Sequence, residues 1–207
     1  MIVAVDLVHF YGQERVIDGI SLQIAPGEFV ALTGESGSGK STLLSILSTL
    51  LHPDSGHIFI DGQSMETLKD PNRFRREYIG FVFQFHYLIP YLNIRENVAL
   101  AAPKRSGEEI MELLERLGIG AIAHKMADEV SGGQRQRAAI ARAVANGPRI
   151  LFADEPTGNL DSKNSEKVFD LFRKIADEGT TLVVATHDRR LAERADRIIE
   201  IKDGRLV

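Results

Sequence analysis

The sequence contains no cysteine, so it has neither a disulfide framework nor a thiolate metal site. No apolar run approaches the ~20 residues that a helix needs to cross a bilayer, so any membrane span must come from another chain. The first residues, 1–6, lack the basic region of a signal peptide and soon reach an aspartate. Basic residues are not in excess, because 25 Lys and Arg face 29 Asp and Glu and leave a net charge of −4. The composition therefore gives no support for a nucleic-acid partner.

Apolar sequence is plentiful enough to form a core. Of the 207 residues, 43% are hydrophobic and 26% are charged. These proportions suit one compact domain over residues 1–207 with room for a small subdomain. Residues 2–30 are predicted to be strands joined by turns, because apolar residues alternate there at Val3, Val5 and Leu7 and again at Leu22 and Ile24.

The stretch Gly34–Ser41 reads Gly-Glu-Ser-Gly-Ser-Gly-Lys-Ser and fits the phosphate-binding loop pattern G-x-x-x-x-G-K-[ST]. Small residues at 36–39 let backbone N–H groups curl around a phosphate. Lys40 adds a positive charge for the β- and γ-phosphates, and the Ser41 hydroxyl suits Mg²⁺. A strand is predicted before the loop at 29–33 and a leucine-rich helix after it at 41–51, whose N-terminal dipole would face a bound anion. An accidental glycine-rich turn explains this context less well.

Two adjacent carboxylates, Asp154 and Glu155, end an apolar stretch that is predicted to be a buried strand. In a doubly wound sheet ligands bind at this end of the strands, and two carboxylates there are costly unless a cation lies near. Asp154 suits an outer-sphere contact to Mg²⁺, and Glu155 suits a base that polarises an attacking water. His187 follows a second buried strand, 181–186, where it is either an ordinary polar strand end or a contact to the γ-phosphate.

A further strand is predicted to deliver Gln84 at its end, followed by the aromatic, proline-broken run Phe85–Leu92. That run is either ordinary packing or a docking surface. Residues 93–130 are predicted to be helical, with a stop at Gly118.

The run Ser131-Gly132-Gly133-Gln134 opens another predicted helix, with Ser131 as its N-cap. It is either a plain capped helix or a second anion site, because two glycines bare the N–H groups of its first turn.

Aromatic and histidine residues elsewhere carry weaker signals. Tyr11, taken alone, is better explained as a core or edge aromatic than as a ring that stacks on adenine. The remaining histidines show no metal-ligand spacing and are interpreted as surface residues; they are His9, His52, His57, His86 and His124.

These motifs, in this order, resemble those of the ATP-binding subunits of ABC transporters. Gly34–Ser41 matches Walker A, Gln84 the Q-loop, residues 131–134 the signature, Asp154 and Glu155 Walker B, residues 159–161 the D-loop and His187 the switch histidine. The resemblance covers nearly the whole chain; Val130 stands where the common signature begins with leucine. It implies an α/β, P-loop NTPase fold with a mainly parallel core sheet, an N-terminal antiparallel β subdomain and a helical signature subdomain at roughly 85–145.

The resemblance also implies ATP and Mg²⁺ as cofactors and assigns roles to single residues. Catalytic roles go to Lys40, Gln84, Glu155 and His187, and magnesium binding to Ser41, Gln84 and Asp154. The resemblance assigns Tyr11 to adenine stacking and so replaces the interpretation of Tyr11 as a core or edge aromatic. Nucleotide contacts are assigned to Tyr11, Gly34, Ser36, Gly37, Ser38, Gly39, Lys40, Ser41, Thr42, Ser131, Gly132, Gly133 and Gln134.

The mechanism implied is a head-to-tail dimer of two copies that closes around two ATP molecules and reopens on hydrolysis. An integral membrane subunit would dock at Phe85–Leu92, which places the chain in the cytoplasm, peripheral on the inner face of the cell membrane. Residues 153–161, 83–85 and 96–98 are similar to the lipoprotein-releasing, macrolide-export and cell-division group.

Three alternatives accompany this interpretation. The ATPase of a non-transporting membrane complex, as in the cell-division branch, stays open. A soluble ABC protein of translation or DNA repair usually carries two such domains or a long coiled-coil insertion, and this chain has neither. A P-loop nucleotide kinase would not need the run at 131–134.

Overall fold

The computed structural model describes residues 1–207, in which strands and helices alternate along most of the chain. The strands are β1 (Ile2–Tyr11), β2 (Glu14–Ile24), β3 (Phe29–Thr33), β4 (Ser55–Ile60), β5 (Gln63–Ser64), β6 (Ile79–Val82), β7 (Ile150–Asp154), β8 (Thr181–Ala185), β9 (Arg197–Lys202) and β10 (Arg205–Leu206). The helices are α1 (Lys40–Leu47), α2 (Pro71–Tyr78), α3 (Ile94–Ala99), α4 (Gly107–Arg116), α5 (Gly132–Val144), α6 (Ser162–Asp177) and α7 (Arg189–Ala192), with a 3₁₀ turn, η1, at Gly120–Ile122.

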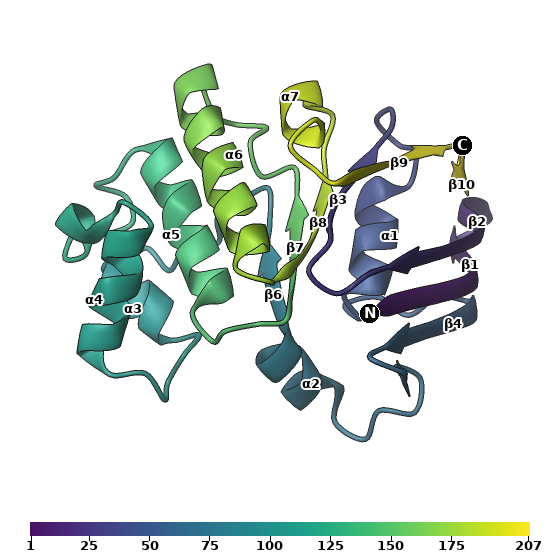
Figure 1. Cartoon of the computed structure of the whole chain (residues 1–207), viewed down its shortest axis with the longest axis horizontal. Coiled ribbons are helices and arrows are strands. Elements are labelled where there is room, and N and C mark those ends of the chain that lie inside the picture. The colour runs from purple at the N-terminus through teal and green to yellow at the C-terminus, as the bar shows by residue number, and fades with distance from the viewer.

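Two sheets form the framework (Figure 1). The central sheet has the order β10-β9-β3-β8-β7-β6, and its strands from β9 to β6 run parallel. The second sheet has the order β2-β1-β4-β5 and is antiparallel throughout. A mainly parallel core sheet beside an N-terminal antiparallel sheet is the predicted architecture, and the prediction of fold class is confirmed.

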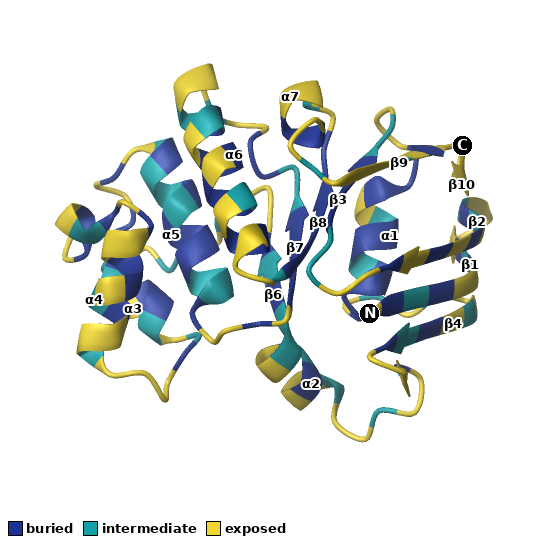
Figure 2. Cartoon of the chain, in the orientation of Figure 1, coloured by how far each residue is buried: buried dark blue, intermediate teal, exposed yellow.

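The central sheet is covered on both faces because its middle strands, β3, β8 and β7, are apolar at four of their five positions, and successive residues of a strand point to opposite faces. On β7, Leu151 and Ala153 join a cluster of buried residues with the helices α3 to α6, whereas Ile150 and Phe152 join a second cluster with α1 and the antiparallel sheet. Figure 2 shows the buried residues of the central strands lying between these two layers. The parallel strand ends are therefore held rigidly from both sides.

The helix after the phosphate-binding loop is shorter than predicted. It ends at Leu47 instead of Leu51, since Thr49 adopts a left-handed backbone with φ of 61°. The N–H groups of Leu50 and Leu51 both donate to the carbonyl of Ser45, at 2.9 and 3.0 Å, and Leu50 lies exposed. The leucine periodicity therefore extends past the helix into a turn.

The predicted helical region 93–130 is only partly helical. It contains α3, α4 and η1, and the residues after η1 form turns. Both α3 and α4 begin with a reciprocal capping box, in which the N-cap side chain and the acid three residues later satisfy each other's backbone N–H groups. The predicted stop at Gly118 is confirmed, with φ of 68° directly after the end of α4.

The alternation predicted for β1 is shifted by one residue in its first half. Ile2 and Ala4 are buried, while Val5 is exposed. Asp6 has φ of 49°, and the pairing with β2 slips between Ala4 and Leu7, which is a β-bulge. Beyond it Leu7 and His9 point inward, so the prediction that His9 is a surface residue is wrong: it is 7% exposed.

Candidate functional site

Four parallel strands end side by side at one edge of the central sheet. In the order β3-β8-β7-β6 they lead into the phosphate-binding loop, His187, Glu155 and Gln84. Segments that lie more than a hundred residues apart in sequence thus meet at the carboxyl ends of neighbouring strands, where open α/β sheets bind ligands. The topology alone therefore brings these four parts of the predicted site together.

A cleft of about 730 Å³ opens at this edge. Its lining residues are Glu14, Val16, Gly34, Glu35, Ser36, Gly37, Gly39, Lys40, Ser41, Thr42, Gln84, Glu155 and His187. Glu14 and Val16 were not predicted as site residues. They belong to β2 of the antiparallel sheet, and no local pattern indicates that this strand reaches the cleft. Val16 is the one hydrophobic residue in this lining; the others are polar, charged or glycine, which suits a triphosphate.

Lys40 lies at the start of α1, directly after Gly39 in the left-handed conformation with φ of 104°. Its ammonium group donates to the carbonyls of Gly34 (2.9 Å) and Glu35 (2.8 Å), which folds the side chain back over the loop. The residue is 7% exposed. The loop therefore presents one positive charge together with the N-terminus of α1 to the cleft.

Asp154 lies at the end of β7 and does not itself line the cleft, but it contacts Ser41, which does. The Ser41 hydroxyl donates to Oδ1 of Asp154 at 2.8 Å. Burial raises the pKa of Asp154 above its usual value and the adjacent Glu155 raises it further, while the Ser41 hydrogen bond and Lys40 oppose both. A cation at this point would favour the ionised form.

The Ser41–Asp154 pair fits Mg²⁺. A hydroxyl and a carboxylate are the hard oxygen ligands that Mg²⁺ takes, and this ion usually keeps several waters and phosphate oxygens instead of a full protein cage. The structure has no group of three or more His, Asp or Glu side chains that could hold a metal ion. The fit concerns ligand chemistry alone.

Glu155 and His187 are in contact with each other in the lining of the cleft. Nδ1 of His187 lies 2.8 Å from Oε2 of Glu155, whose side chain is 16% exposed. Glu155 has φ of 43°, and its N–H donates to the carbonyl of Ala185 on β8 at 2.9 Å. A left-handed backbone at a residue other than glycine is strained and tends to mark functional sites. The turn aims this carboxylate into the cleft and away from the sheet.

Tyr11 does not line the cleft, although it lies at the end of β1 close to Glu14. Its ring is 55% exposed and packs at right angles to the ring of His9, with centroids 4.9 Å apart. Nδ1 of His9 lies 3.0 Å from Oδ2 of Asp54. Because more than half of Tyr11 is exposed, the residue is accessible to a stacking partner.

The run at 131–134 begins α5 as predicted. Ser131 accepts from the N–H of Gln134 (3.3 Å), while the Gln134 side chain accepts from the N–H of Ser131 (2.9 Å). None of these residues lines the cleft. A Cβ at Gly133 would come within 2.5 Å of the Asn164 side chain. Asp161 accepts one hydrogen bond from the side-chain amide of Asn164 and a second from its backbone N–H. The signature turn is therefore packed against the start of α6.

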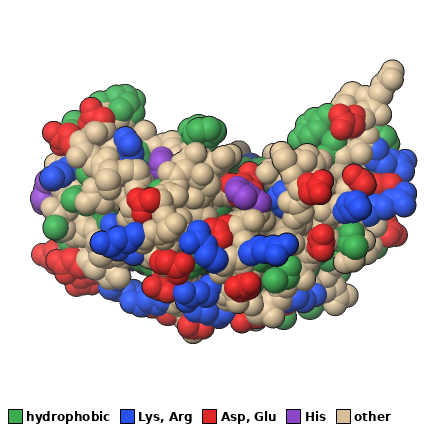
Figure 3. Space-filling view, turned by 90° about the horizontal axis from the view of Figure 1, so that it is seen from above, with side chains coloured by type: hydrophobic (Ala, Val, Ile, Leu, Met, Phe, Trp, Pro, Cys, Tyr) green, Lys and Arg blue, Asp and Glu red, His purple; other side chains and the backbone are tan.

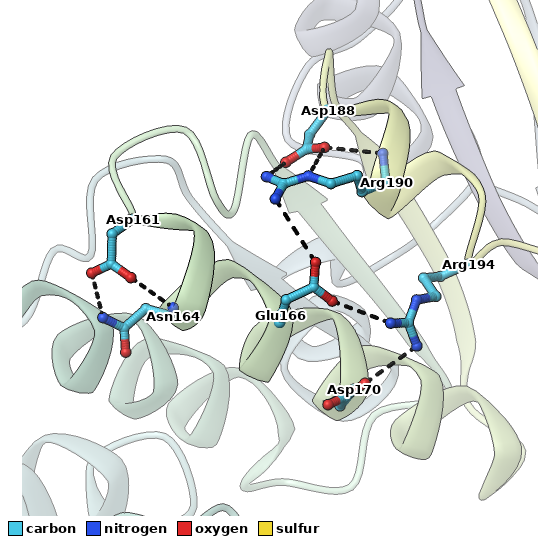
Figure 4. A network of polar contacts seen from close by, with 7 residues as sticks. All are labelled: Asp161, Asn164, Glu166, Asp170, Asp188, Arg190 and Arg194. Atoms are coloured by element: carbon cyan, nitrogen blue, oxygen red, sulfur yellow. Dashed lines mark hydrogen bonds and ion pairs between the residues drawn. The ribbon is translucent and has the colours of Figure 1, made fainter.

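A polar network connects α6 with the segment after His187 (Figure 4). Asp188 accepts from the Arg190 guanidinium at 2.8 Å, and this hydrogen bond lowers the pKa of Asp188. Glu166 on α6 lies 3.8 Å from Arg190 and 3.2 Å from Arg194, which also reaches Asp170. Each pair is largely exposed and worth little alone. Together they link the two elements that carry His187 and Asp161.

Comparison with known families decides the identity of the chain. The ABC transporter family model matches residues 17–158, which is more than half of the sequence. This chain belongs to the ABC transporter family. Its fold and its character as an ATP-binding ATPase, both expected from the motifs, are thereby confirmed.

Individual relatives show which kinds of ABC protein this chain is similar to. The lipoprotein-releasing system ATP-binding protein LolD of Aquifex aeolicus (strain VF5) is 49% identical over 201 residues, which cover 93% of this chain and 90% of that protein. The macrolide export ATP-binding/permease protein MacB of Wolinella succinogenes is 45% identical over 93% of this chain and 31% of that longer protein. A dimeric ATP-binding cassette in a post-hydrolysis state, bound to ADP and Pi, has a TM-score of 0.91 at 38% identity and covers 100% of this chain and 96% of its own. The predicted resemblance to this group of ABC ATPases is confirmed.

Proposed function

We propose that this chain powers a membrane ABC complex of the lipoprotein-releasing type by closing as a homodimer around two ATP molecules and reopening when they are hydrolysed. The observation that supports this most is the cleft, which gathers the Walker A loop, Gln84, Glu155 and His187 at adjacent strand ends. The lipoprotein-releasing assignment rests on the LolD relative, at 49% identity against 45% for the MacB relative. The chain would act on the inner face of the cell membrane. No helix in it is both long and apolar enough to serve as a membrane span.

Hydrolysis assigns a distinct task to each side chain of the cleft. Lys40 leaves the carbonyls of its own loop and binds the β- and γ-phosphates. Glu155 accepts a proton from the attacking water, whose oxygen bonds to the γ-phosphorus as the bond to the β,γ-bridging oxygen breaks. His187 lies beside that carboxylate and orients it toward the γ-phosphate. Ser41, Asp154 and Gln84 would hold Mg²⁺, which would neutralise charge on the phosphate oxygens.

The signature is expected to act on the nucleotide of a second copy. Residues 131–134 offer a helix N-terminus, yet none of them lines the cleft of its own chain. A two-fold dimer brings the same surface of each copy to the other. The structural relative bound to ADP and Pi is itself dimeric. These facts favour a site completed by the partner copy.

The run Phe85–Leu92 has the properties of a docking surface. Its aromatic side chains are exposed, at 61% for Phe85, 64% for Tyr87 and 75% for Tyr91. The backbone beneath them is nonetheless fixed. Arg142 on α5 donates to the carbonyls of His86 (2.8 Å) and Tyr87 (2.6 Å), and the fully buried Asn97 bonds to both backbone groups of Ile89. Exposed aromatics on a rigid backbone suit protein–protein contacts.

Replacement of Phe85 and Tyr91 by serine should abolish co-purification with the membrane subunit of the complex, while the ATPase activity of the isolated chain is preserved. Both side chains are exposed, so the fold loses little packing. Leu100→Ser is the matched control, because Leu100 is 58% exposed in the same helical region but lies outside the run. Intact co-purification of the double variant would remove the docking assignment and leave the ATPase assignment untouched.

Tyr11→Ala should weaken ATP binding by ~1–3 kcal/mol if the ring stacks on adenine as aromatic rings stack on bases elsewhere. Tyr11→Phe keeps the ring and should bind nearly as well as the wild type. Titration calorimetry measures the affinity of both variants for ATP. Equal affinities of the Ala and Phe variants would show that Tyr11 serves packing against His9 and not the nucleotide.

Lipoprotein release is tested on the assembled complex. The chain and the membrane subunit that co-purifies with it, reconstituted in liposomes that carry a lipoprotein, should release the lipoprotein to a soluble carrier only with hydrolysable ATP. Hydrolysis without release would favour macrolide export or a cell-division role.

Figure 3 shows cationic and anionic side chains interspersed over the face it draws, and the proposal involves no nucleic acid.

A further inference from the structure

The C-terminal hairpin, β9–β10, lies directly against the phosphate-binding loop. The N–H of Gly204, in the turn of this hairpin, donates to the carbonyl of Ser38 inside the loop at 3.1 Å. The Gly204 carbonyl in turn accepts from the N–H of Asp18 on β2 at 2.9 Å. Figure 1 shows the yellow hairpin reaching β2 beside α1. One peptide turn therefore ties the loop to the antiparallel sheet.

The contact is so close that no side chain fits in it. A Cβ at Gly204 would lie 2.5 Å from the carbonyl oxygen of Val16, and a Cβ at Gly39 would lie 2.8 Å from the same atom. Val16 itself lines the nucleotide cleft. Three backbones, those of the loop, of β2 and of the C-terminal turn, thus meet at one carbonyl.

An ion pair fastens the turn on its outer side. Nε and Nη2 of Arg205 donate to Oδ2 of Asp18 at 2.8 and 2.6 Å, and this bond is the main cause of the lowered pKa of Asp18. Arg15 donates to the other carboxylate oxygen at 2.7 Å. The pair lies at the surface and contributes modestly to stability. It does hold the hairpin in register with β2.

We propose that Gly204 is a positioning residue for nucleotide binding, because the turn Asp203–Gly204 holds the phosphate-binding loop in the shape that receives the phosphates. The inference rests on the proposed function of the cleft. The loop binds phosphate through backbone N–H groups that must all point inward, and a loop ordered beforehand loses less freedom when the ligand arrives. A loop without this brace would bind ATP more weakly, yet would turn it over normally once it is bound.

The chain contains a matched control for this turn. Asp61–Gly62 joins β4 to β5 with φ of 50° and 78°, and Asp203–Gly204 has φ of 49° and 74°. The two turns therefore have the same residues and nearly the same backbone. A Cβ at Gly62 meets nothing within 4 Å, whereas one at Gly204 meets the Val16 carbonyl. Substitution of the glycine by alanine strains both turns alike, but only at Gly204 does the new side chain push the turn away from its neighbours.

Titration of ATP·Mg²⁺ into the purified full-length variants tests the inference. Gly204→Ala should raise the Kd about five- to tenfold, the effect of losing about one buried hydrogen bond. Gly62→Ala should leave the Kd at its wild-type value despite a similar fall in Tm. At saturating ATP the kcat of Gly204→Ala should stay close to wild type, as it does when binding alone is lost. Equal Kd values for the two variants would overturn the inference.

A second pair of variants keeps the test decisive if Gly204→Ala does not fold. Arg205→Ala removes the ion pair beside this turn, and Arg149→Ala removes the exposed pair with Asp61 beside the control turn. The first should raise the Kd and the second should not; equal values overturn the inference. Lys40→Ala distinguishes a failure of this inference from a failure of the proposed function. If Lys40→Ala no longer binds ATP while Gly204→Ala and Arg205→Ala bind it as the wild type does, only the inference is wrong. A wild-type chain that binds no ATP overturns the proposed function and the inference together.

Discussion

Glu155→Gln is expected to bind ATP as the wild type does and to hydrolyse it ~10²–10⁴-fold more slowly, which is the usual contribution of a positioned general base. The amide keeps the size of the side chain and its place beside His187 but cannot accept a proton from water. Because closure needs ATP and reopening needs hydrolysis, the variant should accumulate as a dimer in ATP and Mg²⁺. Single-turnover hydrolysis and gel filtration measure the two effects separately.

A matched control is Glu112→Gln, which makes the same chemical change at an exposed position of α4. It should hydrolyse ATP at the wild-type rate and show no excess of dimer. Near-normal turnover of Glu155→Gln would exclude Glu155 as the base. A variant that hydrolyses slowly but stays monomeric at saturating ATP would instead break the link between hydrolysis and reopening.

The parts of the site that could be predicted from the sequence are those with a local signal. The phosphate-binding loop, Glu155 and His187 each follow a short apolar strand, and such strands are recognised by residues close in sequence. Their convergence then follows from the rule that parallel strands present their carboxyl ends at one edge. Ser131 was predictable as an N-cap because a capping box lies within four residues.

The rest depends on contacts between distant segments. Val16 reaches the cleft because β2 lies against the phosphate-binding loop. Gly204, more than 160 residues later in the sequence than Ser38, donates its N–H to the Ser38 carbonyl of that loop. Left-handed backbones at Asp6 and Thr49 interrupt otherwise regular apolar patterns, which buries His9 and ends α1 early. Neither residue is a glycine, so the sequence alone does not mark the interruption.

The last expected result concerns which copy supplies the signature. A fusion of two copies, one with Lys40→Ala and the other with Ser131→Arg, should retain ATPase activity. If the signature acts on the partner's nucleotide, both lesions fall in the same site and the other site is intact. If it acts within its own chain, each site carries one lesion and neither works.

Three controls make the fusion decisive. Each single variant, tested as a homodimer, should be inactive. A fusion of wild type with Lys40→Ala must hydrolyse ATP, which establishes that one intact site can turn over. Ser106→Arg removes an equivalent capping box from α4, worth ~1 kcal/mol, and should stay active, which separates the loss of a cap from the loss of the phosphate contact. If the fusion of wild type with Lys40→Ala is active and the fusion of Lys40→Ala with Ser131→Arg is not, Ser131 does not act on the nucleotide of the second copy.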